Sequence, residues 1–290
     1  MDSITLNGYA KINLGLDVLG CLPNGYHEVK MIMQSINLYD TITISTTDDN
    51  DIILKSDNAN LPTNRDNLIY KAARLILDES KVNTGLKISL TKRIPMAAGM
   101  AGGSTDAAAT LIGINKLLNL NYTQQKLREL GVKIGADVPY CIMLGTALSE
   151  GIGEKLTSLT PMPECHILIA KPDIDVSTAL VYKKLDSVPS YNHPDIDGMC
   201  EALSNNSLTG ITDRMANVLE EVTVSEYPVI NTIKNDMLRL KARNSLMSGS
   251  GPTVFGIYDN ITDAKNAFFT MKELDYVKDI FLTEPYTPDL

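Results

Sequence analysis

The segment at residues 95–109, Pro-Met-Ala-Ala-Gly-Met-Ala-Gly-Gly-Ser-Thr-Asp-Ala-Ala-Ala, restricts the fold of this chain more than any other. Its first half has the composition of a glycine loop, and its second half continues as a helix. Backbone N–H groups in such a loop can approach an anion closely, and the helix adds its free N–H groups and the positive end of its dipole. The segment therefore predicts a phosphate site. The residues expected to form it are Pro95, Met96, Ala97, Ala98, Gly99, Met100, Ala101, Gly102, Gly103, Ser104 and Thr105.

Other known phosphate loops do not match this segment. A Walker A loop needs Lys and then Ser or Thr after its last glycine, whereas Gly103 is followed directly by Ser104. Ala101 interrupts the dinucleotide fingerprint, and the His-Arg-Asp and Asp-Phe-Gly tripeptides of protein kinases do not occur in the sequence. A simpler interpretation stays open, in which a glycine turn precedes an ordinary amphipathic helix. The buried stripe of that helix would be Ala107, Leu111, Ile114 and Leu118.

Asp106 lies in the first turn of the expected helix, where a carboxylate suits the helix dipole. The same carboxylate would repel a phosphate if it pointed toward one. We therefore expect Asp106 to face away from the ligand or to reach it through a metal ion.

Composition narrows the class of protein. The chain has 290 residues, 44% of them hydrophobic, which suits a globular protein with two lobes. Its net charge of −9 argues against a nucleic-acid partner, and four cysteines without a Cys-x-x-Cys pair suggest neither a zinc site nor a disulfide framework. The sequence shows no apolar leader and no 18-residue apolar run, so we expect a cytoplasmic protein with no membrane partner.

Strands and helices interleave along the chain, which predicts the α+β class. Alternating apolar residues predict strands at 6–18 and 26–38, joined by a turn at Pro23, Asn24 and Gly25. Further strands are expected at residues 41–45, 51–55, 86–90, 166–170 and 254–258. Helices are expected at residues 67–77, 104–118, 123–130, 217–221 and 229–240. A polar loop is expected at residues 186–198, and a linker at 161–163 divides the chain into domains at 1–160 and 161–290.

Three polar residues outside the loop are candidates for chemistry. Lys11 and Asn13 share the polar face of the first expected strand, and Asp137 lies between a flexible glycine and Pro139. Each has an ordinary structural alternative. Lys11 would be a solvated strand lysine, Asn13 a surface amide, and Asp137 the N-cap of a helix opened by Pro139.

The combination of these segments resembles the GHMP kinases over the whole chain. The first motif is matched by Ala-Lys-Ile-Asn-Leu-Gly-Leu at residues 10–16, followed by Gly-Tyr-His-Glu at 25–28. Residues 95–109 resemble the ATP loop of these kinases, Gly-Ala-Asp-Val-Pro at 135–139 their catalytic-base segment, and Gly-Ser-Gly-Pro-Thr at 249–253 their third motif. The resemblance implies two lobes with the active site in the cleft between them: an N-terminal ATP-binding lobe and a C-terminal ferredoxin-like α/β lobe.

The resemblance also implies roles for individual residues. Asp137 would be the general base that deprotonates the acceptor hydroxyl, and Lys11 its cationic partner. ATP and Mg²⁺ would be the cofactors, with Asn67 and Lys92 near the adenine. The third motif would line the substrate side of the site through Gly249, Ser250 and Gly251.

Within the superfamily, the match is to a branch of isoprenoid biosynthesis whose substrate carries cytidine diphosphate. That branch implies that Tyr26 and Tyr182 stack on the cytosine and that His27 hydrogen-bonds its edge, with Asn13 and Thr178 also in the substrate site. Each aromatic group has an alternative, a core tyrosine at 182 and a turn histidine at 27. Two functions also stay open, a GHMP kinase for homoserine, mevalonate or a sugar, and a nucleotide-binding regulator. The sequence does not decide between a monomer and a homodimer.

One departure from the superfamily pattern concerns Ala101, because these kinases prefer Gly-Leu-Gly-Ser-Ser in the loop. A left-handed backbone at Ala101 would be unfavourable and would weaken ATP binding. Alternatively, the pair Gly102 and Gly103 would move the flexible point by one residue.

Overall fold

The computed structural model describes residues 3–23 and 25–288, and these form two compact units. The first unit comprises the described residues up to Ala10 together with Leu38–Met96 and Ala101–Met143. The second comprises Lys11–Asn37, Ala97–Met100 and the described chain from Leu144 onward. Neither unit is continuous in sequence, and the division at residues 160 and 161 stays a prediction. None of the helices described is both long and apolar enough to cross a membrane.

Two long strands contribute to both units, β1 (Ser3–Cys21) and β2 (His27–Thr47). In the first unit, residues 41–47 of β2 pair antiparallel with β4 (Gly85–Thr91). Strand β4 pairs in turn with β3 (Ile52–Ser56) in parallel. The helices of this unit are α1 (Leu68–Ser80), α2 (Gly102–Leu117), α3 (Gln124–Val132) and α4 (Val138–Met143).

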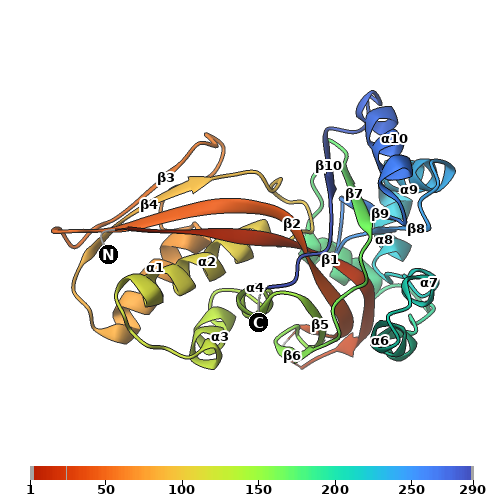
Figure 1. Ribbon diagram of the computed structural model, residues 1–290. Helices are drawn as coiled ribbons and strands as arrows, with labels where there is room; N and C mark the ends of the chain where they lie inside the picture. Colours follow the sequence, from red (N-terminus) through yellow and green to blue (C-terminus); the bar gives the residue numbers. More distant parts are fainter. Residues whose placement is uncertain (1–2, 24, 289–290) are drawn as a thin grey trace. The chain divides into compact units, whose positions relative to one another are not determined.

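Helices α1 and α2 lie side by side in the first unit (Figure 1). The side chain of Asn67 starts α1 by accepting from the N–H of Ile69, and apolar residues then recur at helical spacing. Those buried along α1 are Ile69, Ala72, Ala73, Ile76 and Leu77. Helix α2 packs so closely that a Cβ on Gly113 would lie 2.7 Å from Cδ1 of Ile44 in β2.

In the second unit, residues 29–34 of β2 pair antiparallel with β5 (Thr146–Gly151), which also pairs with β6 (Lys155–Ser158). A four-stranded antiparallel sheet has the order β10-β7-β9-β8. Its strands are β7 (His166–Lys171), β8 (Asn244–Met247), β9 (Val254–Tyr258) and β10 (Asp279–Thr283). Helices α9 (Val229–Arg239) and α10 (Ile261–Lys272) pack against this sheet (Figure 1). The other helices are α5 (Thr178–Leu185), α6 (Ile196–Ser204), α7 (Leu208–Thr212) and α8 (Glu220–Glu226).

The α+β class predicted from the sequence is confirmed, and most predicted elements occur within a few residues of their expected bounds. Residues 41–45 are not a separate strand but the continuation of β2. The predicted loop at 186–198 ends early, because the side chain of Asp195 caps α6. Leu117 rather than Leu118 completes the buried stripe of α2. The predicted turn at 23–25 includes Asn24, which lies outside the described residues.

Replacing Ile76 tests the packing of α1, because this side chain is fully buried. We expect Ile76→Ala to lower the free energy of unfolding by about 2–5 kcal/mol, through lost transfer free energy and the cavity left behind. Urea unfolding followed by circular dichroism measures the change. Lys71→Ala, on the exposed side of the same helix, is the control, and an equal loss in both variants would contradict the assigned core.

Candidate functional site

The glycine loop and the first turn of α2 form the predicted phosphate site. The loop has a left-handed backbone at Ala97, Gly99 and Ala101, with φ values of 50°, 68° and 56°. Ala101 is the N-cap of α2, and no side chain caps the helix there. The first N–H groups of α2 have no partner within the helix, so they suit an anionic ligand.

The structure decides between the two alternatives for Ala101. Gly102 and Gly103 are already helical, so the flexible point has not moved, and Ala101 itself adopts the left-handed conformation. For a residue with a Cβ this costs about 1–2 kcal/mol. A weaker affinity for ATP as a result stays a prediction.

Gly99 lies against the second glycine loop of the sequence, at residues 248–251. The Oγ of Ser248 donates to the carbonyl oxygen of Gly99 at 3.0 Å. A Cβ on Gly99 would lie 2.3 Å from the carbonyl oxygen of Ser248. Only glycine therefore fits, both by its positive φ and by the space available.

Lys11 and Asn13 lie beside these loops in the second unit. Their residues are 5% and 0% exposed, and the Nζ of Lys11 donates to the Oδ1 of Asn13 at 2.7 Å. The backbone N–H of Lys11 donates to the carbonyl oxygen of Met100, and a Cβ on Gly249 would lie 3.6 Å from the Lys11 Nζ. The alternatives of a solvated lysine and a surface amide are therefore wrong. Within the second unit, the structure brings together Lys11 and Asn13 of the first motif, residues 97–100 of the glycine loop and the third motif.

The residues predicted to bind the cytosine form a second group in the second unit. The Nε2 of His27 is 2.7 Å from the Oδ1 of Asp186, and the rings of His27 and Tyr182 are 4.8 Å apart. Tyr26 is 57% exposed, which leaves much of its surface accessible. Thr178 belongs with the third motif, because its Oγ1 is 2.7 Å from the Oγ of Ser250.

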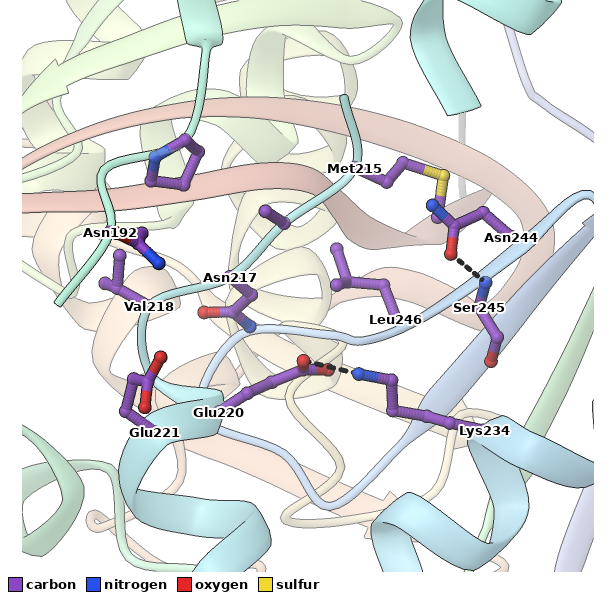
Figure 2. Close-up of a pocket in the computed structure, with 12 residues that line it drawn as sticks. Asn192, Met215, Asn217, Val218, Glu220, Glu221, Lys234, Asn244, Ser245 and Leu246 are labelled. Atoms are coloured by element: carbon purple, nitrogen blue, oxygen red, sulfur yellow. Dashed lines mark hydrogen bonds and ion pairs between the residues drawn. The ribbon is translucent and has the colours of Figure 1, made fainter. Parts of the chain in front are cut away.

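Two residues that hold these groups in place were not predicted from the sequence. Asp186, the partner of His27, carried no signal beyond the start of a polar loop. Asn217 is buried, and its Nδ2 donates to the carbonyl oxygens of Met247 and Gly249, so it fixes the third motif. Asn217 also lines a pocket of about 230 Å³, together with Glu220, Lys234 and neighbouring residues (Figure 2). None of the predicted site residues lines that pocket.

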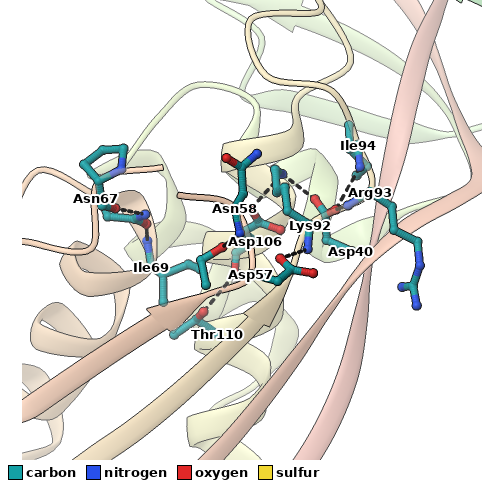
Figure 3. A network of polar contacts seen from close by, with 12 residues as sticks. Asp40, Asp57, Asn58, Asn67, Ile69, Lys92, Arg93, Ile94, Asp106 and Thr110 are labelled. Atoms are coloured by element: carbon teal, nitrogen blue, oxygen red, sulfur yellow. Dashed lines mark hydrogen bonds and ion pairs between the residues drawn. The ribbon is translucent and has the colours of Figure 1, made fainter. Parts of the chain in front are cut away.

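In the first unit, two residues predicted to lie near adenine have partners within the protein (Figure 3). The side chain of Asn67 caps α1 and also donates to the carbonyl oxygen of Pro62. The Nζ of Lys92 pairs with both Asp40 and Asp106. These contacts give both residues a structural role, and their predicted contact with ATP stays a prediction.

Asp106 is 2% exposed and directs its carboxyl group to Lys92. Burial is the main cause that raises the pKa of this carboxyl to about 8, while the positive charge of Lys92 opposes the rise and Asp40 adds to it. Its carboxyl group pairs inside the protein, and whether it faces away from a ligand or reaches one through a metal ion stays a prediction. Asp40 was missed from sequence, since nothing local marks an acid in a long strand as a partner for Lys92.

Asp137 lies directly before α4 and is half-buried. Its carbonyl oxygen accepts from the N–H of Cys141, so its backbone begins the helix. Among the described residues of the first unit, its carboxylate has no hydrogen-bond or ion-pair partner. The side chain therefore does not act as an N-cap there, and its predicted role as a base stays a prediction.

Two family models match the chain, that of the GHMP kinases N terminal domain over residues 67–145 and that of the GHMP kinases C terminal over residues 187–276. With the fold and the glycine loop, they define the class of protein as a GHMP kinase. A homoserine kinase from Cytophaga hutchinsonii shares the fold at 19% identity, with a TM-score of 0.78 over 98% of this chain and 95% of its own.

Closer relatives narrow the class. A 4-diphosphocytidyl-2-C-methyl-D-erythritol kinase from Lachnoclostridium phytofermentans is 53% identical over 98% of this chain and 97% of its own. One from Lachnospira eligens is 51% identical over 99% of this chain and 100% of its own. The crystal structure of a 4-(cytidine 5'-diphospho)-2C-methyl-D-erythritol kinase, 28% identical, gives a TM-score of 0.84 over 98% of this chain and 100% of its own. This chain belongs to the 4-diphosphocytidyl-2-C-methyl-D-erythritol kinase family.

A pair of glycine substitutions tests the contact between the two loops. Gly99→Ala places a Cβ against the Ser248 carbonyl oxygen in a left-handed backbone, so we expect a loss of several-fold or more in ATP affinity and a destabilised protein. Calorimetry of nucleotide binding and thermal unfolding measure both. Gly103→Ala is the control for stability, because a Cβ there meets nothing closer than 3.5 Å. Normal stability of Gly99→Ala would count against the loop packing.

Proposed function

We propose that this protein transfers the γ-phosphoryl group of ATP to the 2-hydroxyl of 4-diphosphocytidyl-2-C-methyl-D-erythritol, in the non-mevalonate route to isoprenoids. The observation that carries the proposal is the buried pair of Lys11 and Asn13 beside both glycine loops, in a chain 53% identical to a kinase named for that substrate. The cytoplasm is the proposed place of action.

Asp137 is the proposed general base, and Lys11 its cationic partner. A base must be able to accept the proton of the hydroxyl, and the Asp137 carboxylate has no donor within its own unit among the described residues. A positioned base contributes typically about 10²–10⁴ in rate. The Lys11 ammonium has Asn13 as a hydrogen-bond acceptor in the second unit, and it keeps donors for a migrating phosphoryl group.

The nucleotide is proposed to bind the loop at residues 95–105 through backbone N–H groups at the start of α2. Mg²⁺ would accompany ATP and neutralise charge on its phosphates. Among residues 3–23 and 25–288, no three His, Cys, Asp or Glu side chains are grouped to hold a metal ion. A cation held mainly by phosphate oxygens and water, as is common for Mg²⁺, does not need such a group.

The cytosine is proposed to stack on Tyr26 and Tyr182 and to hydrogen-bond His27. An ionised carboxylate only accepts, so pairing with Asp186 places a proton on the Nε2 of His27 and leaves Nδ1 for the base edge. Asn13 and Thr178, with Gly249, Ser250 and Gly251, complete the proposed substrate site. Tyr26 and His27 favour this substrate over homoserine, mevalonate or a sugar, which offer no base to stack.

Turnover with different acceptors tests the function and its base together. We expect ADP release with ATP, Mg²⁺ and the cytidine diphosphate substrate, and none with homoserine or mevalonate. Asp137→Asn keeps the shape of the side chain but removes the base, so kcat should fall by about 10²–10⁴ while nucleotide still binds. Wild-type turnover by this variant would exclude Asp137, and activity on another acceptor alone would overturn the substrate.

Replacing Tyr26 tests the proposed recognition of the cytosine. Tyr26→Ala removes a stacking surface worth about 1–3 kcal/mol per base, so KM for the cytidine substrate should rise roughly 5- to 150-fold. KM for ATP should stay unchanged. Tyr26→Phe keeps the ring and is the matched control, expected to behave like the wild type. Equal losses for both substrates would point to a folding defect instead.

A further inference from the structure

Three ionisable side chains are buried together at the start of α2, and we refer to them as the Asp40–Lys92–Asp106 cluster (Figure 3). The side chains of Asp40, Lys92 and Asp106 are 0%, 4% and 3% exposed. A Cβ on Gly102, the first residue of α2, would lie 3.0 Å from the Nζ of Lys92. The cluster therefore lies directly behind the first turn of the helix that follows the nucleotide loop.

The two carboxyl groups of the cluster differ in their donors. Asp40 accepts from the Lys92 ammonium and from the backbone N–H groups of Arg93 and Ile94. Asp106 accepts from Lys92 at 3.0 Å and also hydrogen-bonds the Asp40 carboxyl group, while its Oδ1 has no partner among the described residues. An ionised carboxylate needs donors on both oxygens when it is buried. Of the two acids, Asp106 is therefore the one suited to keep a proton, which it can donate to Asp40.

The charges lead to the same assignment. Lys92 cancels the charge of one carboxylate, so a second ionised acid would leave a net negative charge buried behind the phosphate site. Burial raises the pKa of Asp106 to about 8, with Lys92 opposing and Asp40 adding to the rise. A proton on Asp106 therefore removes one negative charge from behind the first turn of α2.

We propose that Asp106 is a positioning residue of the nucleotide loop, which as a neutral acid holds the first turn of α2 against Lys92 without placing negative charge behind the phosphates. The inference rests on the proposed function, because it takes this loop as the site of ATP. It goes beyond that function because nucleotide affinity would then depend on whether the buried Asp106 carboxyl group carries its proton.

The groups around Asp106 determine whether nucleotide affinity rises or falls with pH. Lys92 and Asp40 face its carboxyl, Thr110 donates to its backbone carbonyl oxygen, and Asp57 accepts from the backbone N–H of Lys92. Raising the pH through 8 ionises Asp106 and adds a repulsive charge, so nucleotide should bind more weakly in alkali. Each unit by which bound nucleotide raises the pKa of Asp106 corresponds to about a tenfold difference in affinity between the two protonation states.

Calorimetry of ADP binding between pH 7.5 and 9.5 tests the proposal, because the phosphates of ADP are fully ionised across that range. We expect the affinity of the wild type for ADP to fall several-fold or more across this range. Asp106→Asn mimics the neutral acid, so it should bind ADP like the wild type at pH 7.5 and keep that affinity up to pH 9.5. Asp57→Asn is the matched control, an exposed acid near the same lysine, and should follow the wild type.

A second measurement needs no nucleotide. The folded-state pKa of Asp106 is raised, so its contribution to stability is present at low pH and is lost as the pH rises from about 4 to 8. The difference in thermal unfolding between Asp106→Asn and the wild type should therefore grow in favour of the variant across that window. Equal pH dependence of ADP binding in both proteins would overturn the inference alone. Failure of the wild type to bind nucleotide at any pH would overturn the proposed ATP site as well.

Discussion

The lack of a side chain at Gly99 fixes how two glycine loops, far apart in sequence, come together. The Ser248 carbonyl oxygen occupies the space in which any Cβ would stand, and the Ser248 hydroxyl donates to the Gly99 carbonyl oxygen. The next residue, Met100, accepts from the backbone N–H of Lys11. One close backbone contact therefore aligns Lys11 of the first strand, residues 97–100 of the glycine loop and the third motif within the second unit.

Local signals explain which parts of the fold were predictable. Asn67 and Thr123 cap α1 and α3 with their own side chains, so those helices begin where the sequence indicates. Strand β1 alternates strictly, and its apolar face from Ala10 to Val18 is buried. The site residues were predicted from the glycine loop and the family resemblance, and most of the roles given to them stay predictions.

The parts that were not predicted depend on tertiary pairing. The strand predicted at residues 41–45 is continuous with the preceding one in β2, whose residues 41–47 pair with β4, and no local pattern indicates that continuity. Both faces of β1 are buried near Lys11 and Asn13, although the alternation of the sequence predicts one polar face. Likewise, Asp40 and Asp186 gain their importance from partners more than 50 and 150 residues away, at Lys92 and His27.

A chain with a net charge of −9 must bind anions through local groups, and the buried side chains of Lys11 and Lys92 are compensated in different ways. Lys92 faces two carboxyl groups, so its charge is balanced within the protein. Lys11, in the described part of the second unit, has only the neutral amide of Asn13 as a side-chain partner. A buried ammonium that is not neutralised within its unit favours an anionic ligand. This contrast agrees with the role proposed for Lys11, rather than Lys92, at the transferred phosphoryl group.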